Sequence, residues 1–343
     1  MRVDPPVYLC APDRVLGEHA QPVTEAVSGA LLDAATAGKY GYTALRVSDR
    51  APVELAELSA ARTLAAAGVD PARVGRLLHA WTYHQGHEFW SPAHYIADRI
   101  GARAAEPAGV QQMCNGAMAA VGQAARDLLA DPAAGPVLVT TADCFPAPGF
   151  DRWGGDYGVC YGDGATSVLV TRQPHGRAVR LLSTATVAVS ALEGMHRGDA
   201  PFAPAPLSGV KTLLPKAAKK EFLTARPDLP FGPVARDAVT GVLARALADA
   251  GVSAHDPRLR AAGLPRLARH VMTDAYEPAF REVCAAPVVR FGTDTGHLGA
   301  GDAVANLADL LDRDDTRPGD LLVLLSAGAG FTWSAAIVEV ESR

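Results

Sequence analysis

The most constraining feature of this sequence is a pattern that occurs twice. "PVLVTTAD" (136–143) with the later "YGDGATSVLVTR" (161–172) resembles "DLLVLLSAGAGFTWSAAIVEV" (320–340): an apolar strand, a glycine-containing turn and a returning strand. Two Ala- and Leu-rich helices, predicted over 51–70 and 236–252, form a second matching pair, and each closes on a cap glycine. We therefore expect two similar halves, 1–173 and 174–343.

Short apolar runs alternate with helical stretches along the chain, which is typical of an α/β protein. A proline-rich segment at about 196–233, which contains "KTLLPKAAKK", interrupts the second half. We interpret it as an insertion or flexible cover, and its lysines as a solvated face rather than a phosphate clamp. The predicted strands are "VYLCA" (7–11), "LLHAWTYH" (77–84), "GPVLVTTAD" (135–143), "ATSVLVT" (165–171), "RHVMT" (269–273) and "DLLVLLSA" (320–327).

Charge and composition exclude several classes of partner and site. The formal net charge is -5 without a basic face or arm, so neither nucleic acid nor a membrane is expected as a partner. The chain begins without an export-type apolar core and has no apolar run near the roughly 20 residues of a membrane span, so we expect a cytoplasmic protein. Five scattered cysteines without a CxxC pair argue against disulfides and zinc. We interpret three further residues as a pocket wall or dimer contact rather than a metal site: His79, His84 and His87.

One cysteine stands out by its position. In "QQMCNGAMAAVGQAARDLLA" (111–130), strong helix formers follow Cys114 and place it at or next to a helix N-terminus. Unpaired N–H groups and the helix dipole favour a thiolate there, and the same amides can stabilise an oxyanion on an attached acyl group. Gly116 permits a sharp turn. Free cysteines are also among the most buried residues, so two interpretations stay open: a nucleophile or a packed thiol.

The second half offers a base for this cysteine. "FGTDTGHLGAGDAVANLADLL" (291–311) places His297 among glycines, and Asp302 follows five residues later at the start of a predicted helix. Asp302 can accept the second ring N–H of His297 and raise its basicity, and it can also act as the helix N-cap. A cysteine, a histidine and a carboxylate are the parts of a nucleophilic site.

Together, these blocks resemble the ketoacyl synthase III branch of the thiolase superfamily along nearly the whole chain. The resemblance implies a five-layer αβαβα thiolase fold of two duplicated halves and a homodimer. It also implies an acyl donor carried by coenzyme A or by an acyl carrier protein, with no permanently bound cofactor. The matching blocks are "GVDPARVGRLLHAWTYH" (68–84), "QQMCNGA" (111–117), "YGDGATSVLVT" (161–171), "RHVMTDA" (269–275), "DTGHLGAGD" (294–302) and "GDLLVLLSAGAGFTWSAAIVEV" (319–340).

The departures from the family pattern shape the predicted chemistry. Condensing members resemble one another in a Cys-His-Asn set, but here the asparagine position is His297. The family histidine matches His270, which is either a second base or carbonyl donor, or a core histidine; His196 is a weaker candidate of the same kind. Unlike an amide, an imidazole can remove a proton, which suits the activation of a hydroxyl. The Cys, His and Asp arrangement is similar to ketosynthase III-like acyltransferases of polyketide pathways.

The sequence therefore predicts ping-pong acyl transfer through Cys114. A small acyl group such as malonyl would load onto its sulfur, with the oxyanion on the N–H groups of Cys114 and, by match, Ala329. His297 with Asp302 would then activate a hydroxyl of a natural-product acceptor such as a polyketide sugar. The alternatives are a condensing or starter-unit enzyme, an acyl shuttle between carrier proteins, and a non-catalytic pathway subunit. The basic stretch 211–220 suits the phosphates of coenzyme A or of a carrier protein.

Overall fold

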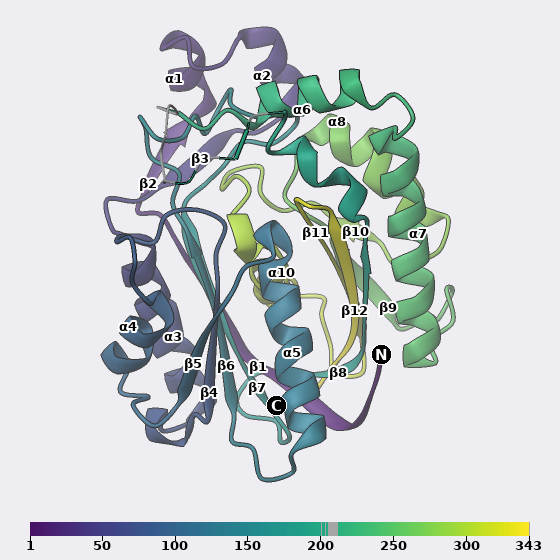
Figure 1. Cartoon of the computed structure of the whole chain (residues 1–343). Helices are drawn as coiled ribbons and strands as arrows, with labels where there is room; N and C mark the ends of the chain where they lie inside the picture. Colours follow the sequence, from purple (N-terminus) through teal and green to yellow (C-terminus); the bar gives the residue numbers. More distant parts are fainter. Residues whose placement is uncertain (200, 203, 205–211, 343) are drawn as a thin grey trace.

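A long mixed sheet runs through the molecule (Figure 1). The computed structural model describes residues 1–199, 201, 202, 204 and 212–342. The strands are β1 (Arg2–Leu16), β2 (His19–Pro22), β3 (Ala44–Val47), β4 (Arg76–Ala80), β5 (Glu106–Val110), β6 (Val137–Asp143), β7 (Gly164–Thr171), β8 (Ala178–Ala188), β9 (Leu259–Gly263), β10 (Val288–Val289), β11 (Leu321–Gly328) and β12 (Thr332–Val340). Ten of them form the main sheet in the order β10-β9-β11-β12-β8-β1-β7-β6-β4-β5, and β2 pairs with β3.

The strand order repeats on the two sides of the β1–β8 pair. Outward from β1 the order is β7, β6, β4 and β5, and outward from β8 it is β12, β11, β9 and β10. The pairing repeats as well, because the two inner pairs on each side are antiparallel and the two outer pairs are parallel. A duplicated unit would produce this order. We propose that the halves join near residue 174, between β7 and β8.

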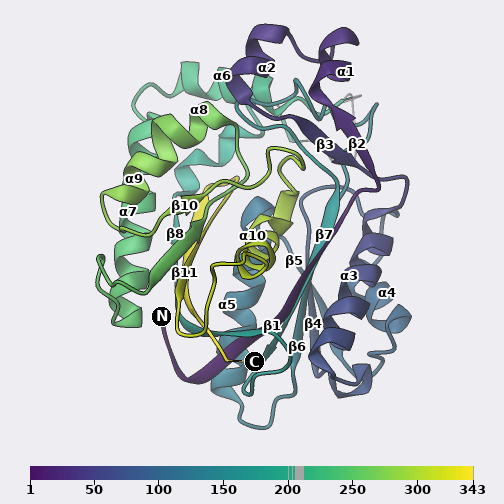
Figure 2. The same cartoon turned by 180° about the vertical axis from the view of Figure 1, so that it is seen from behind.

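Helices cover the outer face of each half of the sheet, and a middle layer of two helices, α5 and α10, lies between the halves, which makes five layers in all (Figures 1 and 2). The helices are α1 (Val23–Ser28), α2 (Ala34–Tyr40), α3 (Pro52–Ala67), α4 (Pro92–Arg99), α5 (Gly116–Ala130), α6 (Pro215–Ala225), α7 (Phe231–Ala250), α8 (Arg269–Val271), α9 (Glu277–Arg281) and α10 (Asp302–Leu311). α3 contacts β1, β6 and β7, whereas α7 contacts β8 and β12. α5 and α10 contact each other and the strands on either side of them. The mixed α/β architecture agrees with the predicted fold class.

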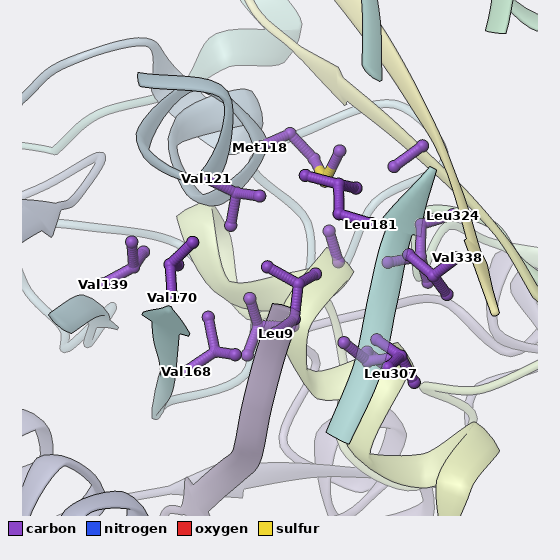
Figure 3. Close-up of a cluster of buried hydrophobic side chains, with 14 of the residues drawn as sticks. Leu9, Met118, Val121, Val139, Val168, Val170, Leu181, Leu307, Leu324 and Val338 are labelled. Atoms are coloured by element: carbon purple, nitrogen blue, oxygen red, sulfur yellow. The ribbon is translucent and has the colours of Figure 1, made fainter. Parts of the chain in front are cut away.

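The central core joins both halves and fixes the two inner helices. Leu9 of β1, Val121 of α5, Leu181 of β8 and Leu307 of α10 belong to one buried cluster, in which they lie close together (Figure 3). The buried positions of α5 are mostly alanine and glycine, which lets the helix approach the strands closely. Two further buried clusters lie under α3 and α4 and under α7 and α9. The start of α5 is therefore held by rigid packing.

Several sequence predictions are confirmed and others are wrong. α3 and α7 end at Gly68 and Gly251, both in the left-handed conformation, as the predicted cap glycines require. The predicted strand 269–273 is wrong, because Arg269–Val271 is helical and Met272–Tyr276 is a π-helical turn. The predicted strand 77–84 ends at Ala80, where the chain turns into a loop.

The described part of the proline-rich segment at about 196–233 includes helix. It contains α6 and the first turn of α7, and α6 packs on the short turn Ser190–Met195. Lys219 of α6 is largely buried, so the prediction of a solvated lysine face is wrong at this position. Lys211, at the start of the basic stretch 211–220, lies outside the described residues. Within the described helices, no segment has the length and hydropathy to cross a membrane.

Candidate active site

A cavity of about 780 Å³ opens at the start of α5 and reaches residues of both halves. Cys114, His297 and Ala329 line it, so three of the predicted site residues face one space. Much of the remaining wall is aromatic, and it includes Tyr83, Phe145, Phe150, Tyr161, Phe231 and Phe331. A cavity of this size, largely apolar with a few polar groups, is typical of a small-molecule site.

Cys114 lies in a single tight turn that leads into α5. The turn spans Met113–Asn115, and α5 starts at Gly116. Glycine is required there, because a Cβ at Gly116 would lie 2.8 Å from the Cβ of Ala80. Since Cys114 is half-buried and precedes the N-terminal end of a 15-residue helix, the helix dipole favours negative charge on its sulfur.

The end of β11 presses against the cysteine turn from the other half. A Cβ at Gly328 would lie 2.5 Å from the backbone nitrogen of Asn115, so only glycine fits. The hydroxyl of Ser326 donates to the carbonyl oxygen of Cys114 at 3.4 Å. These contacts hold the end of β11 against the Cys114 turn, and Ala329, the next residue after Gly328, lines the same cavity as Cys114.

His297 and Asp302 form a buried pair. The distance between His297 Nδ1 and Asp302 Oδ2 is 2.5 Å, and each residue is 3% exposed. The backbone of His297 is fixed by pairing with the segment around Tyr161, since its N–H donates to Cys160 and its carbonyl accepts from Gly162. The ring of Tyr161 packs edge-to-face on the imidazole at 5.4 Å between centroids. Nε2 is therefore the ring nitrogen left for chemistry.

The charges around His297 make it a strong base. Burial alone would lower the pKa of His297, but the Asp302 carboxylate and negative charge on the Cys114 sulfur raise it well above its ordinary value. Burial would likewise raise the pKa of Asp302, and the positive charge of His297 lowers it instead. Cys114 and His297 thus line one cavity, and Asp302 holds the far side of the imidazole.

Asp302 orients the imidazole and does not cap its helix. It is the first residue of α10, and Gly301 occupies the N-cap position without a side-chain cap. Its carboxylate accepts the N–H groups of Leu298 at 2.9 Å and Arg266 at 2.8 Å in addition to His297. The alternative expectation of an N-cap role is therefore wrong, because the carboxylate bonds to His297 and to these two backbone N–H groups instead.

Two buried residues that the sequence reasoning missed hold this region. Arg266 is 2% exposed, and its guanidinium donates to Asn306 at 2.9 Å and to Thr295 at 3.0 Å and pairs with Asp309. All of these contacts are distant in sequence, so no local signal marks Arg266. Asp143 had a weak signal, because its carboxylate ends a strand in which every residue is buried.

Asp143 ties loops of both halves together. Its Oδ1 accepts the N–H groups of Thr82 at 2.8 Å and Tyr83 at 2.9 Å, and its Oδ2 accepts that of Ala300 at 2.9 Å. Ala300 belongs to the turn between His297 and Asp302. Burial raises the pKa of Asp143 to about 6, against the effect of the accepted hydrogen bonds.

Replacing Asp143 with asparagine should destabilise the protein by about 1–3 kcal/mol, because the amide would direct a donor at the N–H of Ala300. The pKa of Asp143 is higher in the folded protein than in the unfolded chain. Its contribution to stability is therefore full below the unfolded pKa and is lost as pH rises through the folded pKa of about 6. The difference from wild type in the free energy of unfolding should therefore shrink between about pH 4 and pH 6. Urea unfolding at both pH values measures it, and a constant difference would contradict this role of Asp143.

The remaining candidate histidines make other contacts. His270 lines the cavity, but its ring stacks on Tyr40 at 5.3 Å, and burial followed by the charge of Lys39 lowers its pKa. His196 lines another part of the cavity. His79 is fully buried and bonds to Thr140 and Gln85.

The two histidines that were grouped with His79, His84 and His87, make contacts of their own. His84 faces Glu88 at the surface, and His87 packs on Trp90. No cluster of metal-binding side chains occurs in the part of the chain that the structure describes.

Two family models match the chain. The model for 3-oxoacyl-[acyl-carrier-protein] synthase III matches residues 109–189, which include Cys114, and the model for the C-terminal part of that enzyme matches residues 281–340, which include His297 and Asp302. No curated protein matches the sequence.

Solved structures match over almost the full length. ChlB3, described as an acyltransferase, is 28% identical, with a TM-score of 0.91 and coverage of 99% of each chain. The 3-oxoacyl-[acyl-carrier-protein] synthase III of Aquifex aeolicus is 19% identical, with a TM-score of 0.77 and coverage of 97% of this chain and 99% of that one. AbyA1, described as a tetronic acid condensing enzyme, is 20% identical, with a TM-score of 0.75 and the same coverages. The last two similarities show the fold.

Proposed function

This chain belongs to the ketoacyl synthase III-like family of the thiolase superfamily, and we propose that it is an acyltransferase that moves a small acyl group, such as malonyl, onto a hydroxyl of a natural-product acceptor. One observation supports this most: His297, whose Nδ1 lies 2.5 Å from Asp302 Oδ2, lines the same cavity as Cys114. That arrangement provides a nucleophile and a general base. The likeness to ChlB3 points in the same direction.

In the loading step, Cys114 takes the acyl group from a thioester of coenzyme A or of an acyl carrier protein. The sulfur attacks the thioester carbonyl carbon, a new carbon–sulfur bond forms, and the bond to the donor sulfur breaks. The N–H groups of Cys114 and Ala329 would hold the oxyanion. The departing thiolate takes a proton from the His297 imidazolium, so the donor leaves as a thiol.

In the transfer step, His297 activates the acceptor. Acylation removes the negative charge from Cys114, which is one of the causes that raise the pKa of His297, so the imidazole is more easily neutral at this stage. Its Nε2 takes the hydroxyl proton, the oxygen attacks the acyl carbon, and an ester forms as Cys114 leaves as thiolate. Asp302 stabilises the resulting imidazolium.

A homodimer, as the resemblance implies, is part of the proposal.

A condensing or starter-unit enzyme is the second candidate, because its members share the fold. It would release carbon dioxide from malonyl thioesters. A shuttle between carrier proteins would use the same acyl-Cys114 and differ only in taking a thiol as acceptor.

The test is intact-protein mass spectrometry of wild type and Cys114→Ala after separate incubation with malonyl, acetyl and propionyl coenzyme A and with a malonyl carrier protein. We expect a malonyl adduct that retains its carboxylate and is absent from the variant. An acetyl adduct formed from malonyl donors would favour the condensing enzyme. Absence of adducts from all four donors would refute covalent acyl transfer.

A further inference from the structure

A polar cluster lies in the cavity wall. The Nζ of Lys219 in α6 lies 2.5 Å from Asp156 Oδ1, and the two side chains are 11% and 1% exposed. The hydroxyl of Tyr161 donates to Asp156 Oδ2 at 2.7 Å. Asp156, Tyr161 and Lys219 all line the cavity. A buried ion pair of this kind costs desolvation energy, so its presence in a ligand cavity calls for a function.

His196 adds a polar atom without a partner to this cluster. Its ring lies 5.5 Å from the ring of Phe331, and among the described residues its buried Nδ1 has no hydrogen-bond partner. Burial, followed by the nearby charge of Lys219, lowers the pKa of His196 to about 4. The ring is therefore neutral at physiological pH. Because the unpaired Nδ1 is buried and not open to the cavity, the proton of the neutral ring belongs on Nε2, which can donate to a ligand oxygen.

The cluster is close to the catalytic pair. Tyr161 connects them, since its ring packs on His297 and its hydroxyl reaches Asp156. A molecule whose reacting hydroxyl lies at His297 would thus extend toward Lys219 and His196. The cavity of about 780 Å³ is of the size that holds a drug-sized ligand, which exceeds a malonyl unit.

Resting on the proposed acyl transfer, we infer that His196 and Lys219 bind a second, neutral oxygen of the acceptor, so that the preferred acceptors carry several hydroxyl groups. The charge of Lys219 is balanced by Asp156, and His196 is uncharged, so the cluster has no net charge to attract a carboxylate. Lys219 keeps N–H donors beyond the one that Asp156 occupies. A site built to bond a hydroxyl discriminates against analogues that lack it, because its buried polar groups are then unpaired.

The experiment compares two alcohols of similar size as acceptors for preloaded acyl-Cys114. Methyl glucoside offers several hydroxyls and cyclohexylmethanol offers one. Loss of the adduct is followed by mass spectrometry, and ester formation by chromatography. Wild type should react about tenfold faster with methyl glucoside, and His196→Leu and Lys219→Met should each reduce this preference to within about twofold, as loss of a hydrogen bond predicts.

The controls separate this inference from the proposed function. Lys220→Met removes the exposed neighbouring lysine of the same helix and should keep the full preference. Since Lys219→Met strands a buried carboxylate, its folding is checked by thermal unfolding, and His196→Leu provides the independent variant. The inference is wrong if wild type shows no preference, if His196→Leu retains it, or if loading slows as much as transfer. Failure to form any acyl-enzyme would instead refute the proposed function, and this inference with it.

Discussion

Replacing His297 with alanine should slow acyl transfer from Cys114 to a hydroxyl by about a thousandfold, within the roughly 10²–10⁴ that a positioned general base contributes. Loading should slow much less, by about tenfold, because the N-terminus of α5 still favours negative charge on the sulfur. Some loss in loading is expected because His297 protonates the departing donor thiolate in the proposed loading step.

Rapid-quench mass spectrometry measures the two steps separately, first the growth of the acyl-enzyme and then its decay with an alcohol. His297→Asn is the matched control, since asparagine can donate a hydrogen bond to the acyl carbonyl and cannot remove a proton. It should transfer as slowly as the alanine variant. Transfer at the wild-type rate in either variant would show that another group is the base, and His270 and His196 would then be examined.

Replacing Asp302 with asparagine should slow transfer by about a thousandfold, because the amide neither stabilises the imidazolium nor fixes the ring tautomer. The two backbone N–H groups that the carboxylate accepts, from Leu298 and Arg266, make the loop depend on it as well. Asp312→Asn, at the exposed end of the same helix, should keep full activity. Equal activity of the Asp302 and Asp312 variants would contradict the proposed role of Asp302.

Stability gives a second measurement on the Asp302 variant. The lowered pKa of Asp302 means that its contribution to stability is present above the unfolded pKa and is lost as pH falls through the folded pKa. The raised pKa of His297 gives a contribution that is full below its unfolded pKa and is lost as pH rises through the folded pKa. The variant should therefore be most destabilised at mildly acidic pH, between the ordinary values of the two groups, which urea unfolding across pH can measure.

The sequence predicts much of the fold, because repeated local patterns determine it. The repeated strand–turn–strand pattern and the two capped helices could be predicted from short stretches of sequence, and so could the position of Cys114 before α5. His297 and Asp302 are five residues apart, so their pairing was also within reach.

Other features depend on contacts that no local pattern reveals. Asp143 and Ala300 are 157 residues apart, and Lys219 and Asp156 are 63 residues apart. The run RHVMT at 269–273 resembles a strand, but in the folded protein it is helical, and the ring of His270 stacks on Tyr40.

The division of the catalytic groups between the two halves has a consequence for how the protein is made. During synthesis the segment with Cys114 leaves the ribosome long before His297 is translated, and the central core needs α10 and β11 to close around α5. A nascent or truncated chain thus exposes a cysteine without its base. The site proposed for acyl transfer is therefore complete only when both halves have folded together.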